Sequence, residues 1–158
     1  MDNDKEALEL HKKIAIETNG KAWSLLEKER RSPDEDLLLI EAASTSLYHW
    51  RIAGTAVHAQ RGEWLLARIF SLLEKPDFAL AHAQNCLAIT QAQPDMMADF
   101  DVAYAHEGMA RALALNNELQ KASEYLQQAR EMGEKIQNPE DRQIFATDLI
   151  SGSWFGMV

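Results

Sequence analysis

Cysteine and long apolar runs are the scarcest features of this 158-residue sequence. Its single cysteine, Cys86, cannot form an internal disulfide, and we expect a buried structural thiol. No apolar run approaches the roughly 20 residues that a membrane-spanning helix needs. The first ten residues, MDNDKEALEL, are charged where a secretory signal would be apolar. We therefore expect a cytoplasmic protein with no membrane partner.

Basic residues are outnumbered as well. The sequence has 16 Lys and Arg against 25 Asp and Glu, a formal net charge of −9. Because nucleic-acid binding depends mainly on attraction between basic side chains and phosphates, this balance predicts no nucleic-acid partner. A glycine-rich phosphate loop, a GxSxG motif and a cysteine pair are all missing. We expect a protein that is not an enzyme and that needs no cofactor.

The strict alternation of apolar and polar residues that is typical of strands is missing too, which predicts an all-α fold of about seven helices. Residues 1–150 are expected to form one helical domain, followed by a tail at 151–158. The expected helices cover residues 4–31, 33–54, 55–74 and 77–91, then, after a linker at 95–101, a fifth helix to about 115, a sixth at 122–137 and a short seventh that ends near 150.

Helix ends carry recognisable signals. Ser32 is expected to cap the second helix through a capping box with Glu35, and Asn138 repeats this arrangement before the seventh helix. Gly54 is expected to adopt a left-handed conformation at the end of the second helix. Asn116 and Asn117 are the left-handed candidates for the tight turn between the fifth and sixth helices.

One segment, residues 61–90, returns weakly 43 residues later (106 − 63 = 43). The matched pairs are Ala67/Ala110, Arg68/Arg111, Ala79/Ala122 and Gln84/Gln127. Such a period indicates stacked helical hairpins, which bury their apolar faces against one another. Arrays of this kind usually bind partners and do not transform them. Enlarging Ala79 or Ala122 is expected to overpack the crossing of the two helices.

These residues resemble the tetratricopeptide repeat (TPR), whose first helix carries Trp-x2-Leu-Gly-x2-Tyr and whose second carries Ala-x3-Phe-x2-Ala. The first copy reads Glu63, Leu66, Ala67, Phe70, then Ala79, Ala83 and Cys86, and the second reads His106, Met109, Ala110, Leu113, then Ala122, Leu126 and Ala129. Glu63 and His106 replace the family's Trp, and the period exceeds 34. A poorer third copy starts at Trp23. The resemblance implies a short right-handed array of antiparallel helical hairpins.

In proteins of this family the first helices of the hairpins line a concave groove. The resemblance therefore implies a groove that binds a peptide or a protein segment. The implied groove residues are Arg61, Trp64, Arg68, Tyr104, Glu107 and Arg111. Exposed arginines in this groove would suit an acidic partner, because Arg holds carboxylates with two hydrogen bonds. Two alternatives remain open: the arginines pair with acidic residues of this chain, or Trp64 fills the core between hairpins.

Five histidines offer a different interpretation, in which the protein is a sensor of a small molecule or a metal. None is spaced as a helical ligand pair, so no metal site is predicted, although His49 and His58 could converge with Asp99 or Asp101. Self-association is a third possibility, which leaves a monomer and a homodimer both open. In the tail, Trp154 and Phe155 are expected to dock on an apolar site of the same chain or of a neighbouring chain.

Overall fold

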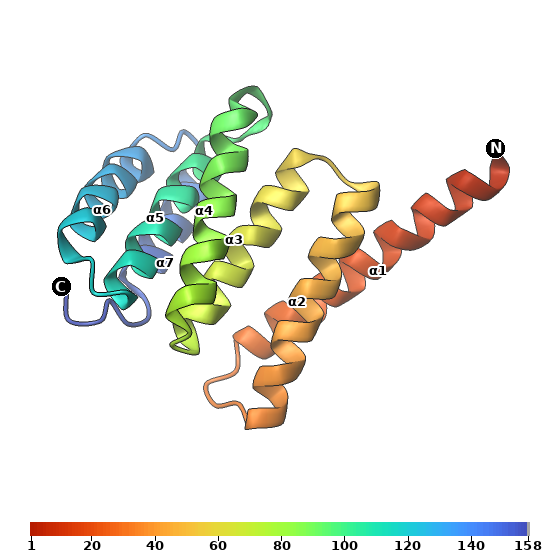
Figure 1. Ribbon diagram of the computed structural model, residues 1–158. Helices are drawn as coiled ribbons and strands as arrows, with labels where there is room; N and C mark the ends of the chain where they lie inside the picture. The colour runs from red at the N-terminus through yellow and green to blue at the C-terminus, as the bar shows by residue number, and fades with distance from the viewer. Residues whose placement is uncertain (158) are drawn as a thin grey trace.

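Seven α-helices and one 3-10 turn are formed by residues 1–157, the part of the chain that the computed structural model describes (Figure 1). No strand occurs in this range, so the prediction of an all-α fold is confirmed. The elements are α1 Asp2–Leu26, α2 Pro33–Ala53, α3 Ala56–Leu72, α4 Pro76–Ala92, η1 Pro94–Met96, α5 Asp99–Leu115, α6 Leu119–Glu134 and α7 Pro139–Ile150.

The helices pack as stacked antiparallel hairpins. α1 pairs with α2, α3 with α4 and α5 with α6, and the hairpins meet where α2 packs on α3 and α4 packs on α5. α3 also contacts α5, and α5 contacts α7, so these first helices of each pair lie next to one another. The N-terminal end of α1 projects beyond the body at one end of the array, and the C-terminus lies at the other (Figure 1).

The 43-residue period is visible in the backbone. α5 begins and ends 43 residues after α3 (99 − 56 and 115 − 72), and α6 begins 43 residues after α4 (119 − 76). The turns match as well, because Glu74 and Asn117 both have positive φ, 53° and 61°. In each turn an amide bonds five residues back, Lys75 to Phe70 O at 2.8 Å and its counterpart 43 residues later at 2.9 Å. This is the Schellman arrangement of a helix end.

Small residues make the close packing of these hairpins possible. Ala67 and Ala110 on the first helices, and Ala79 and Ala122 on the second helices, are at most 1% exposed. Leu66, Phe70, Met109 and Leu113 are buried beside them. The main hydrophobic core runs through all three hairpins and includes Trp154 of the tail. None of the described helices has the length and apolarity needed to cross a bilayer.

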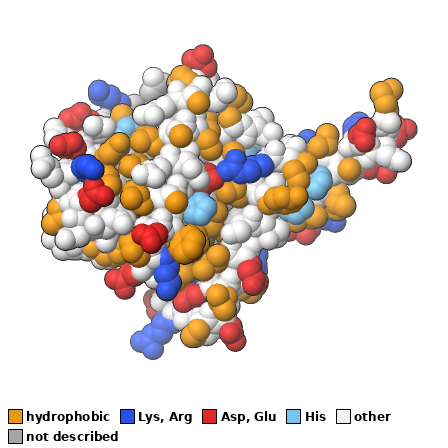
Figure 2. All heavy atoms as spheres, in the orientation of Figure 1, with side chains coloured by type: hydrophobic (Ala, Val, Ile, Leu, Met, Phe, Trp, Pro, Cys, Tyr) orange, Lys and Arg blue, Asp and Glu red, His pale blue; other side chains and the backbone are white. Residues whose placement is uncertain are grey.

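Several helix-end predictions are confirmed. Ser32 and Glu35 form the capping box at the start of α2, and Asn138 accepts a bond from the Asp141 amide at 3.0 Å. α1 continues through Gly20 without a break, as predicted. Figure 2 shows that this helix extends from the body with charged and hydrophobic side chains interspersed at its N-terminal end.

Other boundaries differ from the prediction. α1 ends at Leu26 and not at Arg31, because Arg31 turns back, donates toward the carbonyls of Leu25 and Leu26 at 3.4 Å, and pairs with Asp36 at 2.7 Å. Gly54 is extended and not left-handed (φ −104°, ψ −162°). It is needed for space, since a Cβ there would lie 2.8 Å from Trp50 O.

The second half of the chain shows smaller shifts. The sixth helix was expected at 122–137 but spans Leu119–Glu134, since the repeated turn begins it three residues earlier. The linker expected at 95–101 is shorter, because η1 occupies its first part and α5 begins at Asp99. Of the two left-handed candidates in the α5–α6 turn, Asn117 takes the positive φ and Asn116 does not.

Candidate functional site

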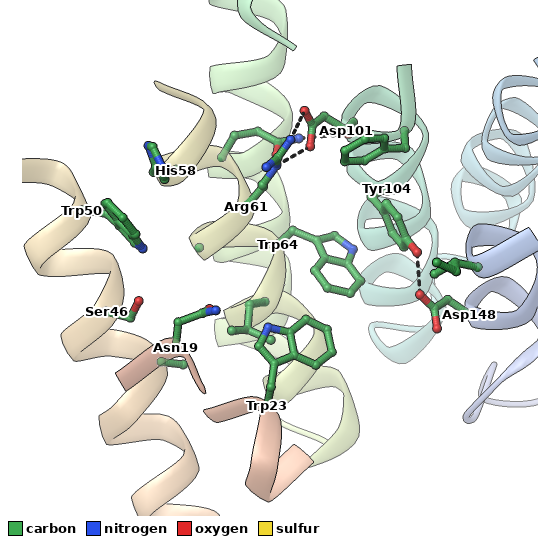
Figure 3. Close-up of a pocket in the computed structure, with 16 residues that line it drawn as sticks. Asn19, Trp23, Ser46, Trp50, His58, Arg61, Trp64, Asp101, Tyr104 and Asp148 are labelled. Atoms are coloured by element: carbon green, nitrogen blue, oxygen red, sulfur yellow. Dashed lines mark hydrogen bonds and ion pairs between the residues drawn. The ribbon is translucent and has the colours of Figure 1, made fainter. Parts of the chain in front are cut away.

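A cavity of about 540 Å³ opens between the first helices of the hairpins and α2 (Figure 3). We call it the groove cavity. Aromatic rings from four helices form much of its wall, namely Trp23, Trp50, Trp64, Phe100 and Tyr104. Its polar lining consists of Asn19, Ser46, His58, Gln60, Arg61, Asp101 and Asp148. The remaining lining residues are small or aliphatic.

Trp64 is half-buried on α3 at the centre of this wall. Its ring lies 6.3 Å from the ring of Trp23, nearly parallel to it, and 4.9 Å from that of Tyr104, edge to face. Gly108 on α5 makes room, because a Cβ there would come within 3.2 Å of the indole. The cavity therefore has aromatic walls that hold one another in place.

The carboxylate of Glu107 accepts hydrogen bonds from three surrounding side chains. Its carboxylate is 1% exposed and accepts from the Trp64 Nε1 at 2.9 Å, from Arg111 Nε at 2.6 Å and from Arg68 Nη1 at 3.4 Å. Two of these donors are on α3 and one is on α5. Three donors offset the free-energy cost of removing the carboxylate from water. The same hydrogen bonds connect α3 to α5.

Arg111 is buried with 3% exposure and binds the tail. Its Nη1 donates to the carbonyls of Ser151 and Ser153 at 2.8 and 3.0 Å. Its guanidinium lies 4.1 Å from the centroid of the Trp154 ring, a cation–π contact. Burial lowers the pKa of Arg111, and the charge of Glu107 opposes that shift.

Arg68 reaches the same place from α3. Its Nη2 donates to the Ser151 Oγ at 2.9 Å while its Nη1 faces Glu107. Arg68 and Arg111 line a smaller cavity of about 240 Å³ beneath the tail and do not line the groove cavity. The expectation that both guanidiniums lie exposed in the groove is therefore corrected: they pair with Glu107 and bind the last residues of the chain.

Arg61, in contrast, does line the groove cavity. Its Nε and Nη2 bind both oxygens of Asp101 at 2.8 and 3.1 Å, and its guanidinium lies 5.1 Å from the Phe100 ring centroid. Asp101 is 2% exposed and also accepts from the Ala98 amide at 2.9 Å, whereas the Arg61 side chain is half-exposed. This pair connects the N-terminal parts of α3 and α5.

Tyr104 points its hydroxyl at Asp148 of α7 and donates a hydrogen bond to it (Figure 3). Burial, together with this carboxylate, raises the pKa of Tyr104 above its ordinary value, so the phenol is a donor at neutral pH. The sequence offered no signal for Asp148, because it lies in a short helix without a clear apolar face. The chain topology alone brings it beside the groove cavity.

The tail folds back on its own chain. Trp154 is 7% exposed, packs into the main core, and donates from its Nε1 to the Leu149 carbonyl at 2.9 Å. Phe155 is half-buried with a φ of 55°, and it packs against the same core. The last residue, Val158, lies outside the described part of the chain.

The histidines are distributed over separate sites. His11 and His49 are in contact with each other, with their Nδ1 atoms 2.6 Å apart, and His82 faces Glu63 at 2.6 Å. His58 accepts from the Thr55 amide at 3.0 Å. It lines the groove cavity together with Asp101, but among the described residues no hydrogen bond or ion pair joins it to Asp99 or Asp101. Within residues 1–157, no three His, Cys, Asp or Glu side chains form a group that could hold a metal ion.

A fixed tautomer follows from the environment of His58. Its ring stacks on Trp50 at 4.0 Å, and burial, followed by the charges of Arg61 and Lys12, lowers its pKa. A neutral imidazole whose Nδ1 accepts from a backbone amide carries its proton on Nε2. His58 therefore contributes one N–H donor at the edge of the groove cavity.

Comparison with known proteins gives no relative: no protein-family model, no curated protein and no solved structure matches this chain.

Proposed function

We propose that this chain is a non-enzymatic scaffold or adaptor that resembles TPR proteins and binds a peptide or protein segment in its groove cavity. The observation that carries the proposal is the cavity of about 540 Å³ with walls of Trp, Tyr and Phe. Trp and Tyr are enriched among the residues that dominate binding energy in protein interfaces. The setting we propose is the cytoplasm.

The order of the cavity wall supports the proposal. Trp64 is held by Glu107 and by two aromatic neighbours, and Tyr104 is held by Asp148. Side chains that are fixed before binding lose little conformational entropy when a ligand arrives. An extended segment can therefore lie across these rings without ordering them first.

Peptide selection tests the proposal. Random peptides displayed on phage are selected against the folded chain, and the dissociation constants of the best binders are measured for the protein and for Trp23→Ala. Trp23 is 37% exposed on the cavity wall, so its removal should spare the fold and weaken binding about tenfold, in line with the loss of one interface anchor. Phe78→Ala, with a ring 59% exposed on α4, is the matched control and should bind normally.

Peptides that bind equally well to both variants would place the binding surface elsewhere. Failure to select any peptide would contradict the proposal.

The volume of the cavity supports a second candidate, a sensor of a small molecule. Ligand pockets commonly measure about 300 to 1,000 Å³, which includes this one. A thermal-shift panel of metabolites and metals separates the two candidates. A large shift with one compound, lost in Trp23→Ala, would favour the sensor.

Analytical ultracentrifugation of the same protein samples measures self-association. It decides between the monomer and the homodimer, which the sequence leaves open.

A further inference from the structure

The charges that line the groove cavity are not balanced. They are Arg61, Asp101 and Asp148. Arg61 binds both oxygens of Asp101, so these two charges cancel each other. Asp148 accepts a bond from the neutral Tyr104 hydroxyl, and its side chain forms no ion pair with a Lys, Arg or His among the described residues. Among the charged side chains that line the cavity, the one without an ion-pair partner is therefore the carboxylate of Asp148. The charge of Asp148 also acts on Arg111, which is buried outside the cavity lining and bound to Glu107 and the tail.

The walls beside this carboxylate are aromatic. Figure 3 shows Trp23 and Trp64 next to each other, with Tyr104 beyond them and its hydroxyl directed at Asp148. The indole N–H of Trp64 already donates to Glu107, so the groups that Trp64 has left for a ligand are its ring atoms. An aromatic face carries negative electrostatic potential and attracts cations, Trp most strongly.

An anionic ligand would find no basic side chain without a partner in the lining of the groove cavity. Arg61 is the one Arg or Lys in the cavity lining, and two of its nitrogens are occupied by Asp101. Arg68 and Arg111 are occupied by Glu107 and the tail. A carboxylate brought to the cavity would also face Asp148. The protein as a whole, with a net charge of −9, repels anions further.

From this arrangement we infer that the groove cavity takes up a cationic side chain, the ammonium of Lys or the guanidinium of Arg, of a bound peptide, beside Trp64, Tyr104 and Asp148. The aromatic rings cover the alkyl part and the face of the cation, while Asp148 pairs with its charge. This inference rests on the proposed function and names the chemistry of the partner. It replaces the acidic partner that the sequence suggested.

Peptide pools with a fixed centre test the inference. Five pools of fluorescein-labelled octapeptides have random flanks and Lys, Arg, norleucine, Gln or Glu at one central position. Binding to the full chain is measured by fluorescence polarisation. The Lys or Arg pool is expected to bind at least about fivefold more tightly than the norleucine and Gln pools, and the Glu pool most weakly, given the strength of a partly desolvated cation–π contact and one ion pair.

Asp148→Asn removes the charge but keeps an oxygen for the Tyr104 hydroxyl. It should lower the ratio between the cationic and the Gln pools clearly, leaving only the part that the aromatic rings contribute. Asp95→Asn is the matched control, because it changes the net charge equally at an exposed residue of η1, outside the cavity. It should leave the ratio unchanged. Circular dichroism and urea unfolding establish that both variants are folded.

The two proposals fail in distinguishable ways. If all pools bind equally and Trp23→Ala weakens them all, the groove binds peptides but the preference for a cation is wrong. If the Glu pool binds best, or if the cationic preference is as large in Asp148→Asn as in the unchanged protein, the inference is overturned as well. If no pool binds, both the proposed function and the inference are contradicted.

Discussion

Trp64 and Glu107 occupy the same position in the two repeats, 43 residues apart, and the indole of the first donates to the carboxylate of the second at 2.9 Å. Equivalent positions on neighbouring first helices thus lie face to face. Two identical residues there would place like groups in contact, whereas a donor and an acceptor complement each other. Arg68 and Arg111, which are identical, meet only because Glu107 lies between them.

Replacing Glu107 with Gln should destabilise the protein strongly. The substitution leaves Arg111, which is 3% exposed, without its buried counter-charge, and removing one partner of such a pair costs about 3 kcal/mol or more. Urea unfolding measures the loss. Glu41→Gln, at an exposed position of α2, changes the charge equally and should have almost no effect. Equal effects of the two substitutions would contradict the central role of Glu107.

Arg111→Lys should release the tail while retaining the charge. Lysine cannot reproduce the planar fork that binds Glu107, Ser151 and Ser153 together, so we expect a loss of about 2 kcal/mol in unfolding free energy and faster proteolysis after Ile150. Deleting residues 151–158 should itself lower stability, because it removes the buried Trp154. In the truncated chain, Arg111→Lys should cost less. Additive losses would mean that Arg111 and the tail act independently.

Ala79→Leu and Ala122→Leu should each destabilise by about 1 to 3 kcal/mol through overpacking, since both Cβ atoms are fully buried at the crossing of paired helices. Ala88→Leu makes the same change at an exposed position of α4 and should be nearly neutral. The midpoints of chemical denaturation compare the three variants. An unchanged midpoint for both buried sites would refute the register of the repeat.

Glu74→Gly should stabilise the protein. Glu74 has a φ of 53°, which strains a residue with a Cβ by about 1 kcal/mol or more, and glycine removes this strain. Part of the gain is offset because glycine loses more conformational entropy than Glu when the chain folds. The net gain should be roughly 0.5 kcal/mol in thermal or urea unfolding. Asn117→Gly, at the equivalent turn, should gain less, because Asn tolerates positive φ. A destabilised Glu74→Gly would show that the turn stores no strain.

Acid should weaken the fold partly through His58. Because its pKa is lowered in the folded state, the unfolded chain takes up the proton first as the pH falls below about 6.5. The stability contributed by neutral His58 is therefore present above that pH and lost below it. His58→Gln keeps an acceptor for the Thr55 amide and should show a smaller loss of stability between pH 7.5 and 5.5 than the unchanged protein does. Identical pH profiles would exclude a contribution from His58.

The sequence was sufficient for the repeat and for most helix ends. Ala79 and Ala122 occupy matched positions and indicate that only a small side chain fits in both repeats. Ser32 and Asn138 each form a hydrogen bond with a residue only three positions further along the chain. Local signals of this kind require no knowledge of the fold. For Trp64 the sequence left two roles open, and the structure shows features of both, because its ring lines the groove cavity and also packs against the main core.

The partners of the groove residues could not be predicted, because they depend on chain topology. Asp148 reaches Tyr104 across 44 residues, and Ser151 reaches Arg111 across 40. No periodic pattern in the sequence encodes the return of the tail over α5. For this reason, the sequence could suggest that Arg68 and Arg111 face one direction but not that another part of the chain already occupies them.

The shared carboxylate of Glu107 has an energetic consequence for the whole molecule. It binds Trp64 on the ligand side and Arg111, which holds the tail, on the other. By thermodynamic linkage, if a ligand that moves the indole changes the affinity of the tail for its docking site by some factor, release of the tail changes the affinity for that ligand by the same factor. Any such coupling between the groove cavity and the C-terminal residues would pass through the carboxylate of Glu107, which contacts both Trp64 and Arg111.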